Sequence, residues 1–160
     1  MKKELLYAIT CLAFCTIIGG AVYEHINIVP VWSAAPPISL SMFQGEYGMK
    51  QEYFWKFIHP VNLLLFIVTL IVHWRSTRRK TILAVLGGYL TILIITSIYF
   101  VPELIQITTT AFSKTADNHL TSRASLWETL SLVRLVILIV LSLVLFLGLT
   151  KSPSPALNEK

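Results

Sequence analysis

Four long apolar stretches constrain this sequence more than any other feature. They run from Leu5 to Val31, from Phe57 to Trp74, from Thr81 to Val101 and from Leu130 to Thr150. Each is close to the ~20 residues that a helix needs to cross about 30 Å of hydrocarbon. Because a bilayer offers no partner to an unpaired backbone amide or carbonyl, a helix is the structure expected for each stretch. We therefore predict an all-α membrane protein with a four-helix transmembrane bundle.

The composition supports this prediction. Only 13% of the 160 residues are charged and 55% are hydrophobic, whereas about a quarter of the residues in an average soluble domain are charged. The net charge of +5 does not indicate nucleic-acid binding, because the lysines and arginines flank the apolar stretches, where they specify topology. The composition therefore excludes a water-soluble globule and a disordered chain, and we expect the lipid bilayer, and no nucleic acid, as a partner.

The positions of the basic residues predict the orientation of the chain. They cluster at residues 2–3, in the short segment 75–80 between the second and third stretches, and at residues 151–160. The positive-inside rule places all three clusters in the cytoplasm. We therefore expect a multi-pass protein of the cell membrane with both termini cytoplasmic and with outer loops at 32–56 and 102–126.

The loops and the end of the chain complete the predicted organisation. Residues 40–57, in the first outer loop, are amphipathic and rich in tyrosine, tryptophan and phenylalanine, which is typical of a segment at the membrane interface. Residues 1–150 are expected to form a single four-helix transmembrane domain. Residues 151–160 contain Ser-Pro repeats and are expected to form a disordered cytoplasmic tail.

Polar residues inside or beside the apolar stretches gather at the predicted outer end. Such residues are costly in hydrocarbon and usually face the interior of the bundle. All four stretches contribute: Glu24 from the first, His59 and Asn62 from the second, Tyr99 and Glu103 from the third, and Arg123, Trp127, Ser131 and Arg134 from the fourth. At about 100° per residue, most of the polar residues named for each helix lie on one face of that helix. In a bundle these four polar faces can converge on one site.

Arg134 is the most informative of these residues. It lies about one turn inside the apolar stretch and stays charged at any accessible pH. An arginine at such a depth costs up to ~3 kcal/mol unless it finds a partner. Glu128 lies on a different face of the same helix, so we expect an ion pair with Glu24 or Glu103. Such a pair either only fixes the register of the helices or also belongs to a ligand site.

The histidines raise two further alternatives. His59 and His73 lie on nearly one face of a helix and about 21 Å apart, as the haem ligands of di-haem cytochromes b do, but no other stretch carries a matching pair. A metal ion near His59 is chemically possible with His25, Glu24 and Glu103 as its other ligands, but the spacing does not require it. We therefore predict no metal and no cofactor, and keep a metal ion near His59, or haem, as alternatives.

Three short motifs are similar to those of a known family. The first helix has a glycine-rich outer half at 19–23, the third stretch ends in Tyr99-Phe100-Val101-Pro102, and the fourth carries Arg123, Trp127 and Arg134. In these motifs the chain resembles the anthrone-oxygenase-like family of small four-helix integral membrane proteins, over about residues 5–150. The resemblance implies an oxidoreductase that converts an anthrone to an anthraquinone without a metal or a flavin.

The chain also departs from the family pattern in two places. Glu103-Leu104 follow the proline that ends the third stretch, where the family usually has an asparagine. Ser131-Leu132 replace the Asn-His of the family between Trp127 and Arg134. A proton-transfer role for that histidine therefore cannot be transferred to this chain.

Two functions from different classes are compatible with these observations. The first is a polar small-molecule site in the outer half of the bundle, belonging to a cofactor-independent, oxygenase-like enzyme with an apolar or aromatic substrate. Arg134 would stabilise an anionic oxygen, and Glu24, His59 or Glu103 would act as the base. The ligand would be held by Asn62, Tyr99, Arg123, Trp127 and Ser131.

The second function is a non-enzymatic membrane subunit, or a binding or permeation module, in which an Arg-Glu network is structural. One four-helix bundle is small for a transporter, so transport would require a homo-oligomer. An enclosed cavity that touches Arg134, Glu24 and Tyr99 would favour the first function. A closed bundle in which Arg134 is fully paired would favour the second, and whether the chain is an enzyme stays open at this point.

Overall fold

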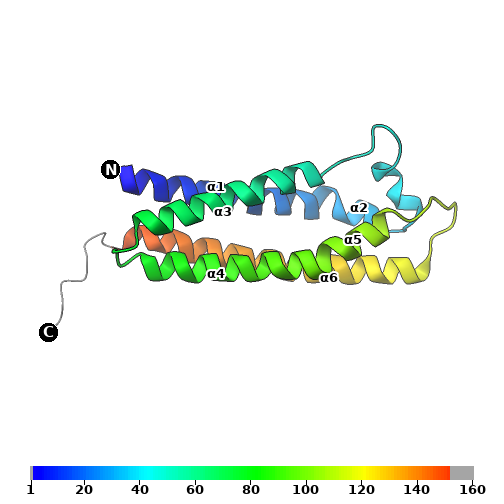
Figure 1. The fold of residues 1–160 in the computed structure, drawn as a ribbon. Helices are drawn as coiled ribbons and strands as arrows, with labels where there is room; N and C mark the ends of the chain where they lie inside the picture. The colour runs from blue at the N-terminus through cyan, green and yellow to red at the C-terminus, as the bar shows by residue number, and fades with distance from the viewer. Residues whose placement is uncertain (1, 152–160) are drawn as a thin grey trace.

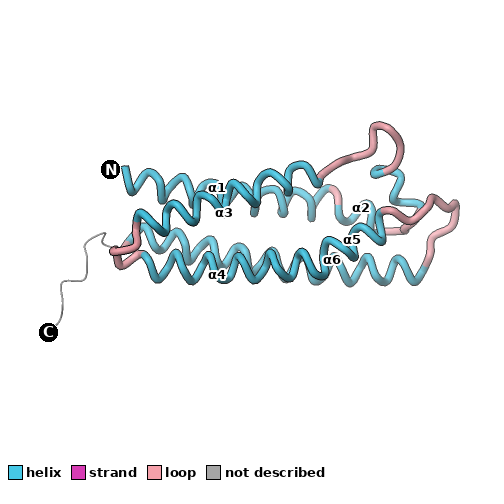
Figure 2. Tube along the Cα trace, in the orientation of Figure 1, coloured by secondary structure: helices cyan, strands magenta, loops and turns pink. Residues whose placement is uncertain are grey.

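Residues 2–151, which the computed structural model describes, form an elongated bundle of helices without a strand (Figure 1, Figure 2). Within this range four helical spans are long and apolar enough to cross a membrane. Figure 1 shows them side by side along one long axis. Glu4 and Lys151 both contact Arg78 in the α3–α4 turn, so the two ends of the described chain lie at the same end of the bundle.

The spans combine longer and shorter helices. The first span consists of α1 (Lys2–Asn27) and α2 (Val29–Ser33), and the second of α3 (Glu52–Val72). The third consists of α4 (Arg79–Ile95), the π-helical turn η2 (Thr96–Phe100) and α5 (Val101–Thr108), and the fourth of α6 (Asn118–Leu147) and the 3-10 turn η3 (Gly148–Thr150). The predicted all-α architecture with four apolar helices is thus confirmed, whereas most of the predicted tail lies outside the described residues.

The first long connection differs from a continuous amphipathic segment. The predicted stretch 40–57 is divided between the 3-10 helix η1 (Ile38–Phe43), a turn, and the start of α3. Leu40 is fully buried, and the ring of Phe43 packs on Trp32 with 6.5 Å between centroids. This connection therefore covers the end of the bundle that holds α2 and α5.

The third span bends at a proline. Pro102 has no N–H to donate to the carbonyl of Ile98, and in a regular α-helix its ring would clash with that carbonyl. The helix instead widens into η2, in which the N–H of Val101 donates to the carbonyl of Thr96, five residues earlier. Such single π turns are frequent at functional sites, and α5 leaves the line of α4 at this point (Figure 1).

The core of the bundle has an aromatic centre. Phe14, Phe66 and Tyr89 are fully buried, and Phe14 meets the other two rings edge to face at centroid distances of 5.4 and 5.2 Å. The packing around α4 depends on Gly88, because a Cβ there would come 2.8 Å from a methyl carbon of Leu141 on α6.

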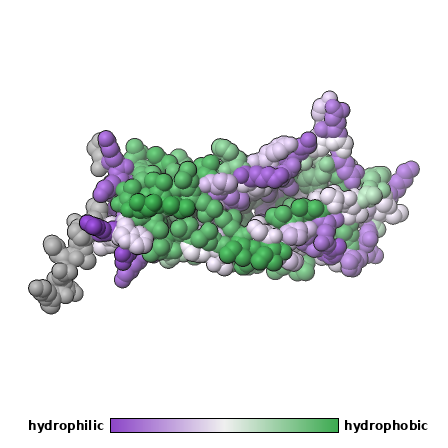
Figure 3. Space-filling view, in the orientation of Figure 1, coloured by the Kyte–Doolittle hydropathy of each residue, from purple (hydrophilic) through white to green (hydrophobic). Residues whose placement is uncertain are grey.

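The surface shows an apolar band between two more polar ends. In Figure 3 hydrophobic side chains cover much of the face, between hydrophilic side chains near the α3–α4 turn and others around the start of α3, α2 and α5. Around the bundle as a whole, many large hydrophobic side chains are exposed, for example Leu12, Leu64 and Leu143 at 58–69%. Such a band is compatible with helices that face lipid.

Candidate functional site

Arg134 on α6 lies at the centre of the candidate site. Its Nη1 donates to the hydroxyl of Thr96 and its Nη2 to the hydroxyl of Ser131, both at 3.1 Å. The guanidinium also lies over the ring of Phe100, 4.3 Å from the centroid. Two of the five N–H groups of the arginine are thus used, and residues 2–151 supply no hydrogen-bond acceptor to the other three.

The predicted ion pair of Arg134 is wrong. Among residues 2–151, no carboxylate oxygen lies within 4.0 Å of this guanidinium. Glu103 instead forms a bidentate pair with Arg123, with oxygen–nitrogen distances of 2.7 and 2.8 Å, and Arg123 also donates to the amide oxygen of Gln106. This pair joins α5 to α6, and it engages two residues that were predicted to serve at the Arg134 site.

The π turn explains why Glu103 points elsewhere. With regular helical periodicity, Thr96, Tyr99 and Glu103 would share one face. The wider turn η2 rotates the residues that follow it, so that Thr96 binds Arg134 while Glu103 binds Arg123. Trp127 on α6 holds this turn in place, because its Nε1 donates to the carbonyl oxygen of Phe100 at 2.9 Å.

A second polar group lies between α1, α3 and α4. Glu24 accepts a hydrogen bond from Nε1 of Trp55 at 2.8 Å, and the Trp55 ring stacks on His59 with 5.4 Å between centroids. Nδ1 of His59 lies 2.7 Å from the hydroxyl of Tyr89. Within residues 2–151 neither Glu24 nor His59 has a hydrogen bond or an ion pair with Arg134. Glu24, Trp55, His59 and Tyr89 thus form a separate cluster that links α1, α3 and α4.

Asn62 lies deeper on the same face of α3 and is fully buried. Its Nδ2 donates to the carbonyl oxygens of Ala13 and Ile58, at 3.1 and 3.2 Å. Its Oδ1 is buried and accepts no hydrogen bond from the described part of the chain. Asn62 thus ties α3 to α1, and it does not line the groove described next.

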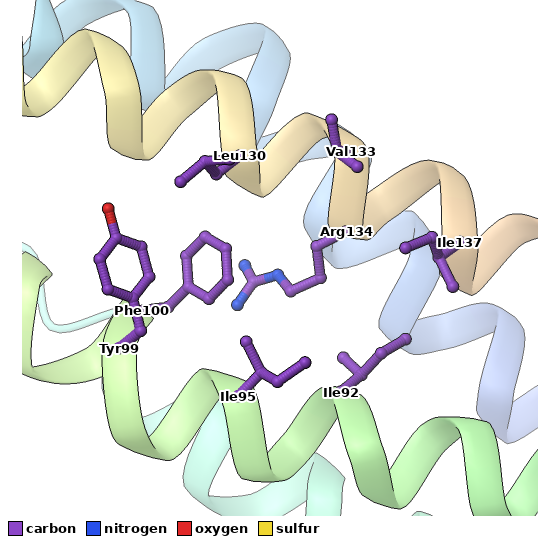
Figure 4. A pocket seen from close by; sticks show the side chains of 8 residues that line it. All are labelled: Ile92, Ile95, Tyr99, Phe100, Leu130, Val133, Arg134 and Ile137. Carbon is purple, nitrogen blue, oxygen red and sulfur yellow. The ribbon is translucent and has the colours of Figure 1, made fainter.

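An apolar groove of about 240 Å³ lies against Arg134 (Figure 4). Its lining comes from α4, η2 and α6: Ile92, Ile95, Tyr99, Phe100, Leu130, Val133, Arg134 and Ile137. Figure 4 shows the guanidinium reaching from α6 toward the Phe100 ring, with Tyr99 on the far side of that ring. The groove opens on the flank of the bundle, because the side chains of Ile95, Val133 and Ile137 are about half exposed, at 47–54%.

Only two of the nine predicted site residues line the groove. Arg134 and Tyr99 line the groove, Ser131 holds Arg134, and Trp127 holds the turn beneath it. The remaining five lie outside the groove, namely Glu24, His59, Asn62, Glu103 and Arg123. The groove touches Arg134 and Tyr99 but is neither enclosed nor lined by Glu24, so it meets only part of the condition set for a small-molecule site.

Two residues outside the predicted site set complete the environment of Arg134. Thr96 is a direct hydrogen-bond partner, and Phe100 provides the ring beneath the guanidinium. The sequence does contain a relevant signal, because a proline within a helical stretch, here Pro102, predicts a distorted turn just before it. Which residues that turn would bring toward α6 could not be read without its geometry.

The residues considered for a metal ion do not gather. Within residues 2–151, no three side chains of His, Cys, Asp or Glu come close enough together to hold one. His25 bonds to the carbonyl of Ala21 and Glu103 to Arg123. Nδ1 of His73 lies 2.9 Å from the carbonyl oxygen of Thr69. These contacts leave the arrangement without a metal-ligand set near His59.

No protein-family model matches the chain, and neither a curated protein nor a solved structure is significantly similar to it. The resemblance drawn from three short motifs therefore remains an expectation. The case for a function rests on the surroundings of Arg134.

Proposed function

We propose that the chain is an integral membrane protein that takes up an apolar, ring-containing small molecule from the bilayer and binds one anionic or carbonyl oxygen of it at Arg134. The observation that carries this proposal is the Arg134 guanidinium, three of whose N–H groups have no acceptor among the described residues. It lies in a groove whose other lining is almost entirely aliphatic and aromatic. An uncompensated arginine is costly inside a span, and a ligand oxygen would supply the missing acceptor.

The shape of the groove favours a flat ligand. The rings of Tyr99 and Phe100 form one wall, and Ile95 and Ile137 offer apolar contact nearby (Figure 4). Aromatic rings pack well against such walls in offset or edge-to-face geometry. A fused aromatic ketone or phenol fits these surroundings, with its rings in the groove and its oxygen at the guanidinium.

We further propose a place for the chain in the cell membrane. Four apolar spans support a multi-pass arrangement, and the basic residues 2–3, 75–80 and 151 share one end of the bundle. The positive-inside rule assigns this end, and with it both termini, to the cytoplasm. The groove then lies in the half of the bundle nearer the outer surface.

The enzymatic version of this proposal is a cofactor-independent oxygenase. A base removes a C–H proton next to the carbonyl, and the electron pair moves onto the oxygen, where Arg134 stabilises the negative charge. The electron-rich ring can then react with O₂ directly. For an anthrone the balance is one anthrone plus one O₂ giving one anthraquinone plus one water. His59 and Glu24 are the titratable side chains proposed to accept the proton; neither lines the groove, so the proton would reach them through an intervening water molecule.

A second candidate, a non-enzymatic subunit, also has a specific observation in its favour. Charged and polar side chains link the helices at the outer end, as in the Arg123–Glu103 pair and the 2.7 Å bond from Ser33 to Glu128. In that case Arg134 would be one more structural link, and the chain would act through a partner or a homo-oligomer.

Binding of anthrone, compared with anthracene, distinguishes these candidates. Anthracene has the same rings but no oxygen, and a hydrogen bond to a charged group contributes about 1.5–3 kcal/mol. We expect saturable binding of anthrone to the protein in lipid nanodiscs, about 10- to 100-fold tighter than that of anthracene, with empty nanodiscs as the blank. Arg134→Met should abolish this difference, whereas the control Arg123→Met should keep it.

The outcomes are separable. If Arg134→Met discriminates anthrone from anthracene as well as the unmodified chain does, the binding proposal is wrong. If discrimination is lost as expected but an oxygen electrode records no anthrone-dependent O₂ uptake, the chain binds such molecules without oxidising them.

A further inference from the structure

The charges of the bundle are strongly segregated between its two ends. At the end with the α3–α4 turn, the basic residues are Lys2, Lys3, Arg75, Arg78, Arg79, Lys80 and Lys151, and Glu4 is the only acidic residue among the described ones. Seven positive charges against one give this end a net charge of +6. The described residues of the other half carry five basic and six acidic side chains, a net charge of −1.

Arg78 neutralises the single carboxylate at the basic end. It is 3% exposed and pairs with Glu4. Its Nε and Nη2 also donate to the carbonyl oxygens of Lys151 and Leu149, at 3.0 and 3.1 Å, and its guanidinium lies 5.5 Å from the ring centroid of Tyr7. Arg78 is thus an internal clamp that fastens the end of the fourth span to the α3–α4 turn.

The other six basic residues have no acidic partner among residues 2–151. None of them lies within 4.0 Å of a carboxylate oxygen in the described part of the chain. Arg75 and Lys80 are exposed, and Arg79 is half-buried. They stand at the two ends of one short turn, so their fields add at its surface.

An exposed tryptophan places this turn at the level of lipid headgroups. Trp74 is 51% exposed, and the guanidinium of Arg79 lies 5.2 Å from its ring centroid. Ile71, one turn earlier on α3, is 67% exposed and continues the apolar flank of the helix. Tryptophan beside basic residues at the end of a span is typical of the interface between headgroups and hydrocarbon.

We propose that the α3–α4 turn binds the headgroup of an anionic phospholipid, with the phosphate at Arg75, Arg79 and Lys80 and the upper part of an acyl chain against Trp74 and Ile71. Charge complementarity selects an anionic over a zwitterionic lipid. The apolar flank beside Trp74 selects a lipid over a soluble phosphate. The proposal rests on insertion of the chain in a bilayer, and it is independent of the groove at Arg134.

Lipid retention, read by native mass spectrometry, tests this site. The protein is purified with equal amounts of phosphatidylglycerol and phosphatidylcholine that carry the same acyl chains, and the lipids that remain bound are counted. We expect a preference for phosphatidylglycerol. Each basic residue near an anionic surface contributes enough that removing three should weaken retention of phosphatidylglycerol about 100-fold.

Two triple variants make the comparison charge-matched. The test variant combines Arg75→Gln, Arg79→Gln and Lys80→Gln, and the control variant combines Lys50→Gln, Lys56→Gln and Lys114→Gln. Both lose three positive charges, but only the first loses them at the turn. The proposal is overturned if the control loses the preference as much as the test variant does, or if the unmodified chain retains both lipids equally.

If the test variant fails to fold, measurements on the unmodified chain still test the proposal. The preference of the unmodified chain should fall between about 0.05 and 0.5 M salt, because exposed charges are screened over that range, and a preference that ignores salt overturns the proposal. Displacement of the lipid by excess inorganic phosphate would also overturn it. Arg134→Met should keep the preference, and release of the chain from membranes by alkaline extraction would instead contradict the membrane insertion proposed above.

Discussion

Replacing Arg134 by methionine is expected to leave the bundle about as stable as before, which is unusual for the loss of a hydrogen-bonded arginine. The change removes the bonds to Thr96 and Ser131 and the contact with the Phe100 ring. Side-chain hydrogen bonds between membrane helices average about 0.6 kcal/mol each, and a cation–π contact contributes about 1 kcal/mol. The total loss is therefore about 2 kcal/mol.

The substitution also stabilises the bundle by a similar amount, because it removes a charge from the span. An arginine in the central part of a span costs about 3 kcal/mol, and this cost disappears in Arg134→Met, while the methionine chain keeps most of the apolar contacts to the groove. The free energy of unfolding should therefore change by no more than about 1 kcal/mol, with the sign in favour of the variant. This result would assign Arg134 to binding, as proposed, and not to folding.

Reversible unfolding in mixed micelles, followed by circular dichroism as the fraction of SDS rises, measures this change. In the SDS-unfolded state the Arg134 side chain can reach the headgroup layer of the micelle, so the titration includes the cost of burying its charge in the folded bundle. The control is Arg123→Met, which leaves the mostly buried Glu103 without its bidentate partner and should lose about 1–2 kcal/mol. A loss of more than about 2 kcal/mol in Arg134→Met would refute the reasoning and make this arginine a structural link.

Three further predictions concern the packing of α4, η2 and α6. Gly88→Leu should destabilise the bundle by about 1–3 kcal/mol, because a Cβ at this position already meets Leu141. The control Gly87→Leu should not destabilise it, because a Cβ at Gly87 meets nothing within 4 Å. Equal melting temperatures of the two variants would contradict this packing. Pro102→Ala should convert η2 to a regular α-helical turn and weaken anthrone binding at least tenfold, and unchanged binding would show that the groove does not need the π turn. Trp127→Phe removes the donor to the backbone of η2 and should lower the free energy of unfolding by about 1 kcal/mol in SDS titrations, a value that an unchanged midpoint would disprove.

The number and type of the spans could be predicted because length and hydropathy determine them almost alone. The ends of the helices could not. The fourth helix begins at Asn118, well before the apolar stretch at Leu130, since the side chain of Asp117 caps it by accepting from two backbone N–H groups. Polar residues on the outer side of this first part lower its mean hydropathy, although Leu120 and Ala124 on the inner side are buried.

The candidate site was predicted less completely than the fold, mainly because of the π turn η2. Arg134 was identified because a charge in an apolar stretch is conspicuous. Its partners were not, because facing was derived from an ideal helix and η2 breaks that periodicity just before Glu103. The engagement of Glu24 by Trp55 was equally hidden, since the sequence does not tell which residue of a long loop and helix start will reach another helix.

The groove opens sideways between α4 and α6, on the flank of the bundle. A ligand would therefore enter it from the lipid, and its binding should be expressed relative to its concentration in the lipid. A ligand that arrives through hydrocarbon has already left water, and a compound that buries about 200 Å² of apolar surface gains about 5 kcal/mol in doing so, a several-thousand-fold enrichment in the membrane. The relevant concentration is then the mole fraction of the ligand in the lipid. A weak and rapidly reversible contact at Arg134 is enough for high occupancy, and a dissociation constant referred to the aqueous phase will rise with the amount of lipid in the assay.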